Sequence, residues 1–346
     1  MNRVTPRSMG RALPWLVTPL VCSTVATAQS AHAAESAATS YFTATLENDL
    51  FVGNDSGYTN GIAVGWTHAG FTEFDDQNLP GWIHALAGHL YVGTAAGKRR
   101  AVSYAVGQAM QTPGDITVTR PLPDDAPYAG LLAWSVSLQA YDERVVDRWG
   151  LTLGVVGPLS GAEPAQKLIH EVIGADEPRG WENQIDNEPV FAAGVERLWR
   201  IGNHALGDST AADIIAIASG DLGNLQSRVA LGMGVRLGRG LERSFPSAAV
   251  LPGRRANWLA SAGTNDWNAF LNVQGMFVAN DIGIDGNSFR ESPSVPLEHW
   301  QAQAVTGLAF NWQRWALLLS VAVATDRFEG QRDTGRFGSL SVTWKL

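Results

Sequence analysis

The sequence predicts an all-β fold, a twelve-stranded antiparallel transmembrane β-barrel with one short loop helix. Three observations predict this fold. Twelve segments show the alternation of side chains that marks strands, and single-chain bacterial barrels have an even number of strands. Each segment has roughly 9–13 residues, enough for a tilted strand to cross a bilayer. Beyond residue 28, no apolar run approaches the ~20 residues that a membrane helix needs.

The first 28 residues have the composition of a secretory signal peptide. They contain three arginines and no acid, then an apolar run, and they end in Ala26-Thr27-Ala28, a small-x-small cleavage pattern. We therefore divide the chain into a signal peptide, 1–28, and an outer-membrane β-barrel domain, 29–346; cleavage after Ala33 is the alternative. The single cysteine, Cys22, lies in the signal, so the mature chain has no disulfide and no thiolate ligand.

The charge of the mature chain argues against a nucleic-acid partner. Without residues 1–28 the chain keeps 22 of its 25 basic residues and all 33 acidic ones, a net charge of −11. Nucleic-acid binding requires a basic surface. An exported chain of this kind is either a soluble periplasmic protein or an outer-membrane barrel.

The predicted strands are 41–49, 60–69, 100–112, 130–140, 148–157, 189–200, 212–220, 227–238, 267–279, 299–311, 314–325 and 335–345. In 101–110, one parity carries small or polar residues and the other carries mostly large ones, which we expect to face the lumen and the lipid respectively. A secreted β-sandwich also alternates and is the alternative, but the length and even number of the strands favour the barrel. The C-terminal Leu346 is atypical, because many outer-membrane barrels end on an aromatic residue.

Aromatic residues and links predict how the barrel sits in the membrane. Tryptophans near strand ends are typical of interfacial girdles: Trp66, Trp82, Trp134, Trp149, Trp181, Trp199, Trp312 and Trp344. The short link 312–314 predicts a periplasmic turn. The longer polar segments 70–99, 239–266 and 280–298 predict external loops.

One segment breaks the strand pattern in favour of a helix. Ser160-Gly-Ala-Glu-Pro164 supplies a cap, an early acid and an early proline, and Gly174 can end the helix. Gln166 and His170 are four residues apart and therefore share one face. A helix on a barrel rim can hold His170 against the outer wall as a general base, and the acids that follow it, including Asp176, can orient it or help to bind a cation.

A second candidate cluster lies where the first predicted strand ends. Asn48 and Asp49 are at its end, and Thr59 begins the next strand. Oxygen-bearing side chains of this kind can hold a divalent cation or polarise a carbonyl, although Asx residues also simply mark turns. With neither cysteine nor paired histidines, the ligands favour calcium over zinc. No Gly-x-Ser-x-Gly nucleophile motif is present, which favours attack by water.

The chain resembles the lipid A 3'-O-deacylase family of outer-membrane enzymes along essentially the whole mature chain. The resemblance rests on the order and spacing of the segments 47–51, 57–61, 107–108, 112–113, 125–130, 154–158, 170–174, 180–184 and 285–287. It implies a twelve-stranded barrel with its active site on the outside, between the wall and a loop helix. It also implies an outer-membrane location and lipid A, or lipopolysaccharide, as partner.

The resemblance also implies roles for individual residues. His170 matches the water-activating base, Asn48 and Asp49 match the calcium and oxyanion site, and Thr59 matches a hydroxyl of that site. Asp176 stands where the family has a glutamate. Ala126 stands where the family has an arginine in the pattern Asp-Arg-Pro-Tyr-Ala-Gly, so an arginine brace is missing here.

The expected function is therefore Ca²⁺-assisted ester hydrolysis that removes the 3'-linked acyloxyacyl group of lipid A. The alternatives are an outer-membrane phospholipid esterase and a non-catalytic structural or porin-like barrel. A barrel sealed against lipid is expected to be a monomer.

Overall fold

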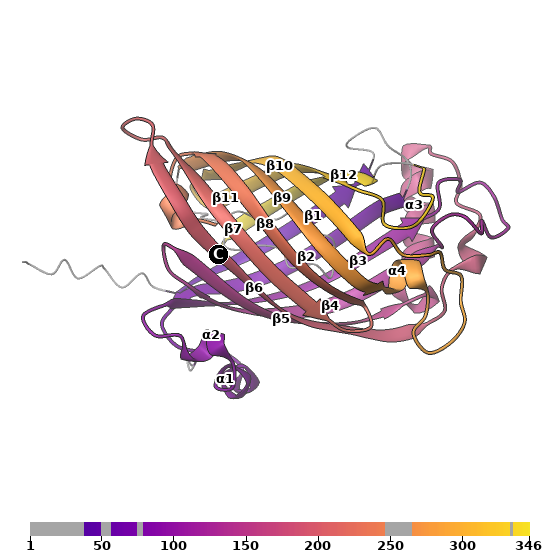
Figure 1. Cartoon of the computed structure of the whole chain (residues 1–346), viewed down its shortest axis with the longest axis horizontal. Coiled ribbons are helices and arrows are strands. Elements are labelled where there is room, and N and C mark those ends of the chain that lie inside the picture. The colour runs from indigo at the N-terminus through magenta and orange to yellow at the C-terminus, as the bar shows by residue number, and fades with distance from the viewer. Residues whose placement is uncertain (1–37, 50–56, 75–78, 246–264, 333–334) are drawn as a thin grey trace, which may run out of the picture. The chain divides into compact units, whose positions relative to one another are not determined.

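Twelve antiparallel strands close into a barrel in which each strand pairs with its neighbours in sequence and β1 pairs with β12 (Figure 1). The computed structural model describes residues 38–49, 57–74, 79–245, 265–332 and 335–346. The barrel belongs to one compact unit, Ala37–Leu346, and the predicted signal peptide, 1–28, lies outside the described residues. The predicted fold class is confirmed.

Every predicted segment is a strand, and several strands extend beyond their predicted ends. Their bounds are β1 (Thr39–Asn48), β2 (Gly57–Phe71), β3 (Arg99–Thr112), β4 (Ala129–Tyr141), β5 (Val145–Val156), β6 (Glu188–Ala205), β7 (Ala211–Leu222), β8 (Gln226–Gly238), β9 (Asp266–Asp281), β10 (Trp300–Trp312), β11 (Trp315–Ala324) and β12 (Gly335–Lys345).

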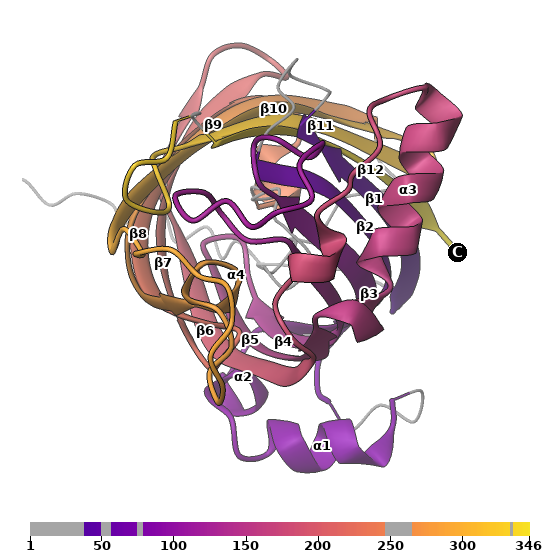
Figure 2. The same cartoon turned by 90° about the vertical axis from the view of Figure 1, so that its right-hand side faces the viewer.

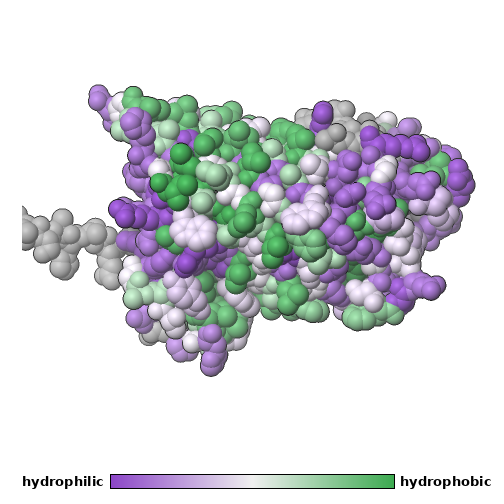
Figure 3. All heavy atoms as spheres, in the orientation of Figure 1, coloured by the Kyte–Doolittle hydropathy of each residue, from purple (hydrophilic) through white to green (hydrophobic). Residues whose placement is uncertain are grey.

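The two faces of the wall differ as the alternation predicts. On β2 and β3, the outward parity carries Ile62, Trp66 and Val106, which are all exposed. The inward parity carries small or polar residues such as Thr67 and Ser103, which are buried. Figure 3 shows apolar side chains gathered over the strands that face the viewer and hydrophilic ones gathered at the loop end on the right. The barrel therefore presents an apolar belt to its surroundings.

In the described parts of the connections there are four α-helices, whereas the sequence predicted one. The predicted helix is α3 (Ala162–Ile173), and the others are α1 (Gly81–Ala87), α2 (Tyr91–Thr94) and α4 (Ile282–Asp285). The same parts contain the short 3-10 helices η2 (Pro158–Ser160), η3 (Trp181–Asn183) and η4 (Leu241–Arg243). Among the described residues, no helix has the length and apolar character needed to span a bilayer.

The helix α1 was missed because it is only seven residues long and depends on the wall for its burial. It lies outside the ring of strands (Figure 2). Its Ile83 and Ala87 pack with α2 against the outward-facing Val102 and Leu138, which are fully buried as a result. A helix this short is stable only through such tertiary packing.

The topology corrects the predicted placement of the loops. Successive antiparallel strands return the chain to alternate ends, so 70–99, 239–266 and 312–314 share one end of the barrel and 280–298 lies at the other. The three long segments therefore cannot all be external. Segment 280–298 lies at the end that carries α3, which we call the α3 end (Figure 1).

Candidate active site

The helix α3 lies against the outer wall of the barrel at the α3 end and contacts β3 and β4 (Figure 2). Its first turn packs on Met110 through Ala162 and Ala165. Gly130 permits this contact, because a Cβ at that position would lie 2.2 Å from Ser160 Oγ and 2.4 Å from Ala162 Cβ. Gln108 donates to the carbonyl of Ser160 at 2.7 Å and ties the start of the helix to β3.

Two loops interlock to support this helix. Tyr128, before β4, packs on Trp181 with ring centroids 4.9 Å apart and planes tilted by 54°, and donates to the carbonyl of Ile116 at 3.2 Å. A Cβ at Gly180 would lie 2.4 Å from the Tyr128 ring, so only glycine fits there. The expectation that Trp181 is an interfacial aromatic is wrong, because Trp181 is buried between the loops together with Tyr128. Burial raises the pKa of the Tyr128 hydroxyl to about 12.

Trp181 also fixes the orientation of Gln166 on α3. The indole Nε1 donates to Gln166 Oε1 at 2.7 Å, in a side chain that is only 1% exposed. An indole N–H can only donate, so the atom it meets must be the amide oxygen. The amide nitrogen of Gln166 therefore points away from the indole, and it has no hydrogen-bond partner within the described residues.

His170 lies one turn after Gln166 on the same buried face of α3 and is 6% exposed. Its Nδ1 lies 2.6 Å from the carbonyl oxygen of Asp176. A carbonyl accepts hydrogen bonds but cannot donate them, so Nδ1 carries the proton and a neutral imidazole keeps its lone pair on Nε2. The main chain of the loop thus sets the tautomer that a general base requires.

Asp176 contacts His170 only through its main chain. Gly174 ends α3 at φ +71°, and this left-handed turn brings the chain back so that the amide of Ala175 donates to His170 O at 3.0 Å. The side chain of Asp176 is exposed. Sequence reasoning considered its carboxylate, whereas the structure brings its carbonyl to the imidazole.

Asn48 and Asp49 are buried at the end of β1, on the side of the barrel where α3 lies. Asn48 pairs with Asn60 on β2, and Asn60 pairs with Met110 on β3. Paired residues point to the same face, so Asn48 and Asn60 share the outer face with Met110, on which α3 begins. Two strand spacings of about 4.8 Å put Asn48 within about 10 Å of that contact.

Thr59 lies in β2, where the pairing with β3 skips one residue between Tyr58 and Asn60. Its side chain lies outside the described part of the chain. Asn60 was not among the predicted site residues. Its signal in the sequence was its place in the segment Gly57-Tyr-Thr-Asn-Gly61, where a polar residue occupies an outward position.

A ready-made cluster of three or more His, Cys, Asp or Glu side chains for a metal is absent from the described residues. The oxygen donors at the end of β1 are the amide of Asn48 and the carboxylate of Asp49, which follows it, and both residues are buried. Both are hard donors of the kind that calcium takes, together with carbonyl oxygens and water. The chemical type of the donors therefore fits calcium.

Two further elements fix the loop that carries α3. Asn287, after α4, accepts from the Asp186 amide at 2.8 Å and donates to the Asp186 carbonyl at 2.9 Å. It also donates to Glu188 at 3.2 Å. Asn287 therefore fixes the main chain of the loop between β5 and β6, a contact that we call the Asn287 clamp.

Ala126 lies away from the helix, in a buried cluster with Met276, Val278, Ile284 and Phe328. This cluster is apolar, so an arginine brace has no polar partner among these side chains. Position 126 in this chain contributes to packing at the α3 end.

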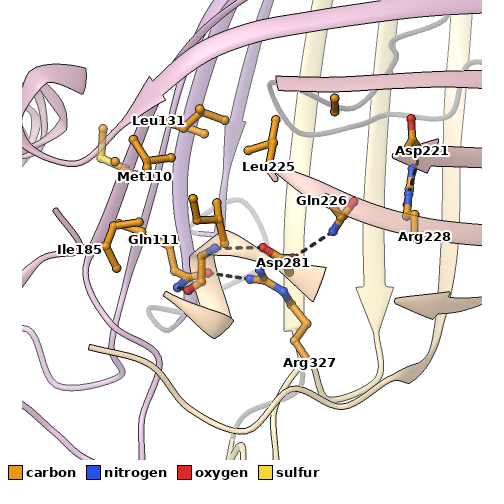
Figure 4. Close-up of a pocket in the computed structure, with 17 residues that line it drawn as sticks. Met110, Gln111, Leu131, Ile185, Asp221, Leu225, Gln226, Arg228, Asp281 and Arg327 are labelled. Carbon is orange, nitrogen blue, oxygen red and sulfur yellow. Dashed lines mark hydrogen bonds and ion pairs between the residues drawn. The ribbon is translucent and has the colours of Figure 1, made fainter. Parts of the chain in front are cut away.

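A pocket inside the barrel, separate from the candidate site, has a volume of about 110 Å³ (Figure 4). Arg327 donates to Gln111 at 2.8 Å and to Asp281 at 3.1 Å, and Gln226 donates to Asp281 at 2.9 Å. These paired groups tie strands and loops together across the lumen. At the other end, Asp213 similarly pairs with Arg200 and Arg236. Such networks obstruct the lumen and argue against a wide pore.

Comparisons with known proteins agree with this architecture. A family model described as "Outer membrane protein LpxR" matches residues 20–346. The structure of LpxR from Salmonella typhimurium superposes with a TM-score of 0.68 at 16% identity, covering 88% of this chain and 99% of that chain. The β-domain of the Bordetella autotransporter BrkA reaches a TM-score of only 0.39 at 10% identity, covering 89% of this chain and 98% of that chain. Among curated proteins, no sequence match is significant.

Proposed function

Since the chain belongs to the LpxR family of outer membrane proteins, we propose that it is a lipid A deacylase that removes the 3'-linked acyloxyacyl group by attack of water on the ester. The observation that carries the proposal is the contact between His170 Nδ1 and the carbonyl of Asp176. It leaves Nε2 of a neutral imidazole as a proton acceptor, on a helix that lies against the lipid-facing wall.

His170 has the central role in the proposed reaction. Its Nε2 takes a proton from water as the water oxygen bonds to the acyl carbon, and returns it to the sugar oxygen as the ester C–O bond breaks. The Asp176 carbonyl holds the imidazole in place as its charge develops. No covalent acyl-enzyme forms, in agreement with the absence of a nucleophile motif in the sequence.

Asp49 and Asn48 are the residues that would hold calcium. When bound, the ion would polarise the ester carbonyl and stabilise the oxyanion. Asn48, on the outer face of the wall, is also placed to orient the substrate carbonyl. Thr59 contributes its hydroxyl to this site in the proposal. Asp176 contributes through its main-chain carbonyl.

The setting of the site fits a membrane lipid substrate. The apolar outer face continues below the amide row of Asn48 and Asn60 with Leu46 and Ile62, which are exposed. Acyl chains can lie along this face while the polar sugar stays at the α3 end. As in the sequence analysis, we propose that residues 1–28 are a signal peptide and that the barrel acts as a monomer.

The test is mass spectrometry of lipid A from cells that express the protein, with and without calcium chelation. We expect the loss of one acyloxyacyl group, its suppression by chelation, and no loss with His170→Ala. The variant must show the heat-modifiable mobility of a folded barrel. Release of fatty acid from phospholipid with intact lipid A would instead favour the phospholipid esterase, and no product from a folded wild type would favour a non-catalytic barrel.

A further inference from the structure

Asn60 places an amide on the outer wall at a point where the next outward positions along β2 are apolar. Ile62, two residues further along β2, faces outward with 55% of its surface exposed, and Trp66 continues the same face. Barrels keep this face apolar because lipid offers no hydrogen bonds. The side chain of Asn60 is only 6% exposed and therefore lies in a recess of the wall.

The amide of Asn60 makes no side-chain hydrogen bond to any described residue, whereas the nearby Gln108 donates to Ser160. The polar atoms of Asn60 are not among the fully buried unpartnered atoms of the described residues, so water or a ligand can reach them and supply the missing hydrogen bonds. Such a group on the outer wall is expected where a polar part of a ligand binds.

The register places this amide beside the candidate active site. Asn60 lies directly opposite Asn48 on β1 and opposite Met110, on which α3 begins. The Cβ atoms of directly paired residues are about 4.5–5.5 Å apart. Asn48 and Asn60 can therefore contact groups carried by neighbouring carbons of one sugar ring.

We propose that Asn60 is a specificity-determining residue that binds the amide-linked acyl group next to the ester that is cleaved; this inference rests on the proposed function. The N–H and C=O of a trans secondary amide point in opposite directions, so one carboxamide can pair with only one of them. The Oδ1 of Asn60 accepts from the amide N–H of the acyl group. Glycerophospholipids have no N–H at this place, so Asn60 selects acylated amino sugars against them.

Two synthetic monosaccharides test the inference. Both carry the same acyloxyacyl ester at position 3, and they differ only in whether the acyl chain at position 2 is attached through an amide or through an ester. We expect the wild type to have a kcat/KM about 10- to 100-fold higher on the amide substrate, since a site built to bond a polar group rejects the analogue that lacks it. Asn60→Leu should lose most of this preference, through a fall on the amide substrate alone.

The control is Val235→Leu, at an exposed outward position on β8, which should keep both rates and the preference. If Asn60→Leu does not give a heat-modifiable barrel, Asn60→Val replaces it, with the same expected loss of preference, because valine also lacks a hydrogen-bonding group. Equal falls of kcat/KM on both substrates would mean a structural role and overturn the inference. A wild type that cleaves both substrates without preference also overturns it and leaves the proposed function intact. Cleavage of neither substrate by a folded wild type overturns the proposed function, and this inference with it.

Discussion

The indole of Trp181 donates to Gln166 Oε1 at 2.7 Å and so couples the loop before β6 to the helix that carries His170. The same indole packs in a tilted arrangement against Tyr128 from the loop before β4. Two loops and one helix thus meet at a single side chain. This contact supports the position of His170 on the outer wall, together with the direct packing of α3 on β3 and β4.

Trp181→Phe tests this coupling, because it keeps an aromatic ring against Tyr128 and removes the donor. Gln166 Oε1 then loses its partner in a buried place, at a cost of about 1–3 kcal/mol. We expect a lower thermal unfolding midpoint in detergent and a several-fold lower rate of lipid A deacylation. Trp312→Phe, at a position 64% exposed at the opposite end, is the control and should change neither. An unchanged rate in Trp181→Phe would show that α3 is held without this bond.

The contact between His170 and Asp176 predicts opposite results for two neighbouring substitutions. Asp176→Ala keeps the carbonyl that accepts from Nδ1, so it should retain activity within about threefold of wild type. In Gly174→Ala there is room for the Cβ, but the alanine must adopt φ +71°, which costs an L-residue about 1–2 kcal/mol. Relief of this strain should move the turn and displace the Asp176 carbonyl from His170. We expect this variant to lose much more activity. The reverse order would assign the role to the Asp176 carboxylate.

The barrel was predictable from sequence because its signals are local. Strand length, alternation and the absence of membrane helices each depend on neighbouring residues, and they located all twelve strands. The helix α3 had its own periodicity and closing glycine, although the predicted cap is wrong, because Gly161 is the N-cap and no side chain caps the helix. By contrast, α1 is shorter and is buried by Val102 and Leu138, which lie on strands that follow it in the chain.

The candidate site was predictable only in part. His170, Asn48 and Asp49 stand in recognisable segments, but their supports come from distant parts of the chain. Asn287 contacts Asp186 across 101 residues, a separation that no periodicity reveals. The tautomer of His170 depends on a carbonyl, which every residue has and which therefore leaves no trace in the sequence.

Asn287→Ala tests the clamp on the loop that carries α3. The substitution removes both hydrogen bonds to the Asp186 main chain and the one to Glu188. We expect a loss of about 1–3 kcal/mol in local stability, seen as faster proteolysis between β5 and β6, together with a lower deacylation rate. Asn203→Ala, at an exposed position near the opposite end, is the control. Unchanged proteolysis would mean that the loop is fixed by its other contacts.

The raised pKa of Tyr128 predicts a loss of stability in alkali. An unfolded tyrosine ionises near pH 10, whereas Tyr128 in the fold does so at about 12. Between these values the folded state keeps a proton that the unfolded state releases. The contribution is therefore complete below pH 10 and is lost as the pH rises through 12, a change on the order of 2–3 kcal/mol. Thermal unfolding of wild type and Tyr128→Phe from pH 8 to 12 measures it. In Tyr128→Phe, the fall of stability between pH 10 and 12 should lack this contribution. Tyr91→Phe, at an exposed position, should show the same fall as the wild type.

Ala126 stands where the resemblance implies an arginine, and a substitution at this position tests whether that arginine would affect activity. If the arginine were a brace for the site, Ala126→Arg should raise activity. The structure predicts the opposite, because Ala126 is 3% exposed among Met276, Val278, Ile284 and Phe328, where a guanidinium would be buried among apolar side chains. Burying an unpaired charge is strongly unfavourable, so the thermal midpoint should fall without a gain in rate. Ala126→Met adds comparable length without charge and separates crowding from desolvation, since it should lower the midpoint less. A faster and equally stable Ala126→Arg would mean that the arginine reaches out of the cluster and that its loss changed the enzyme's substrate preference.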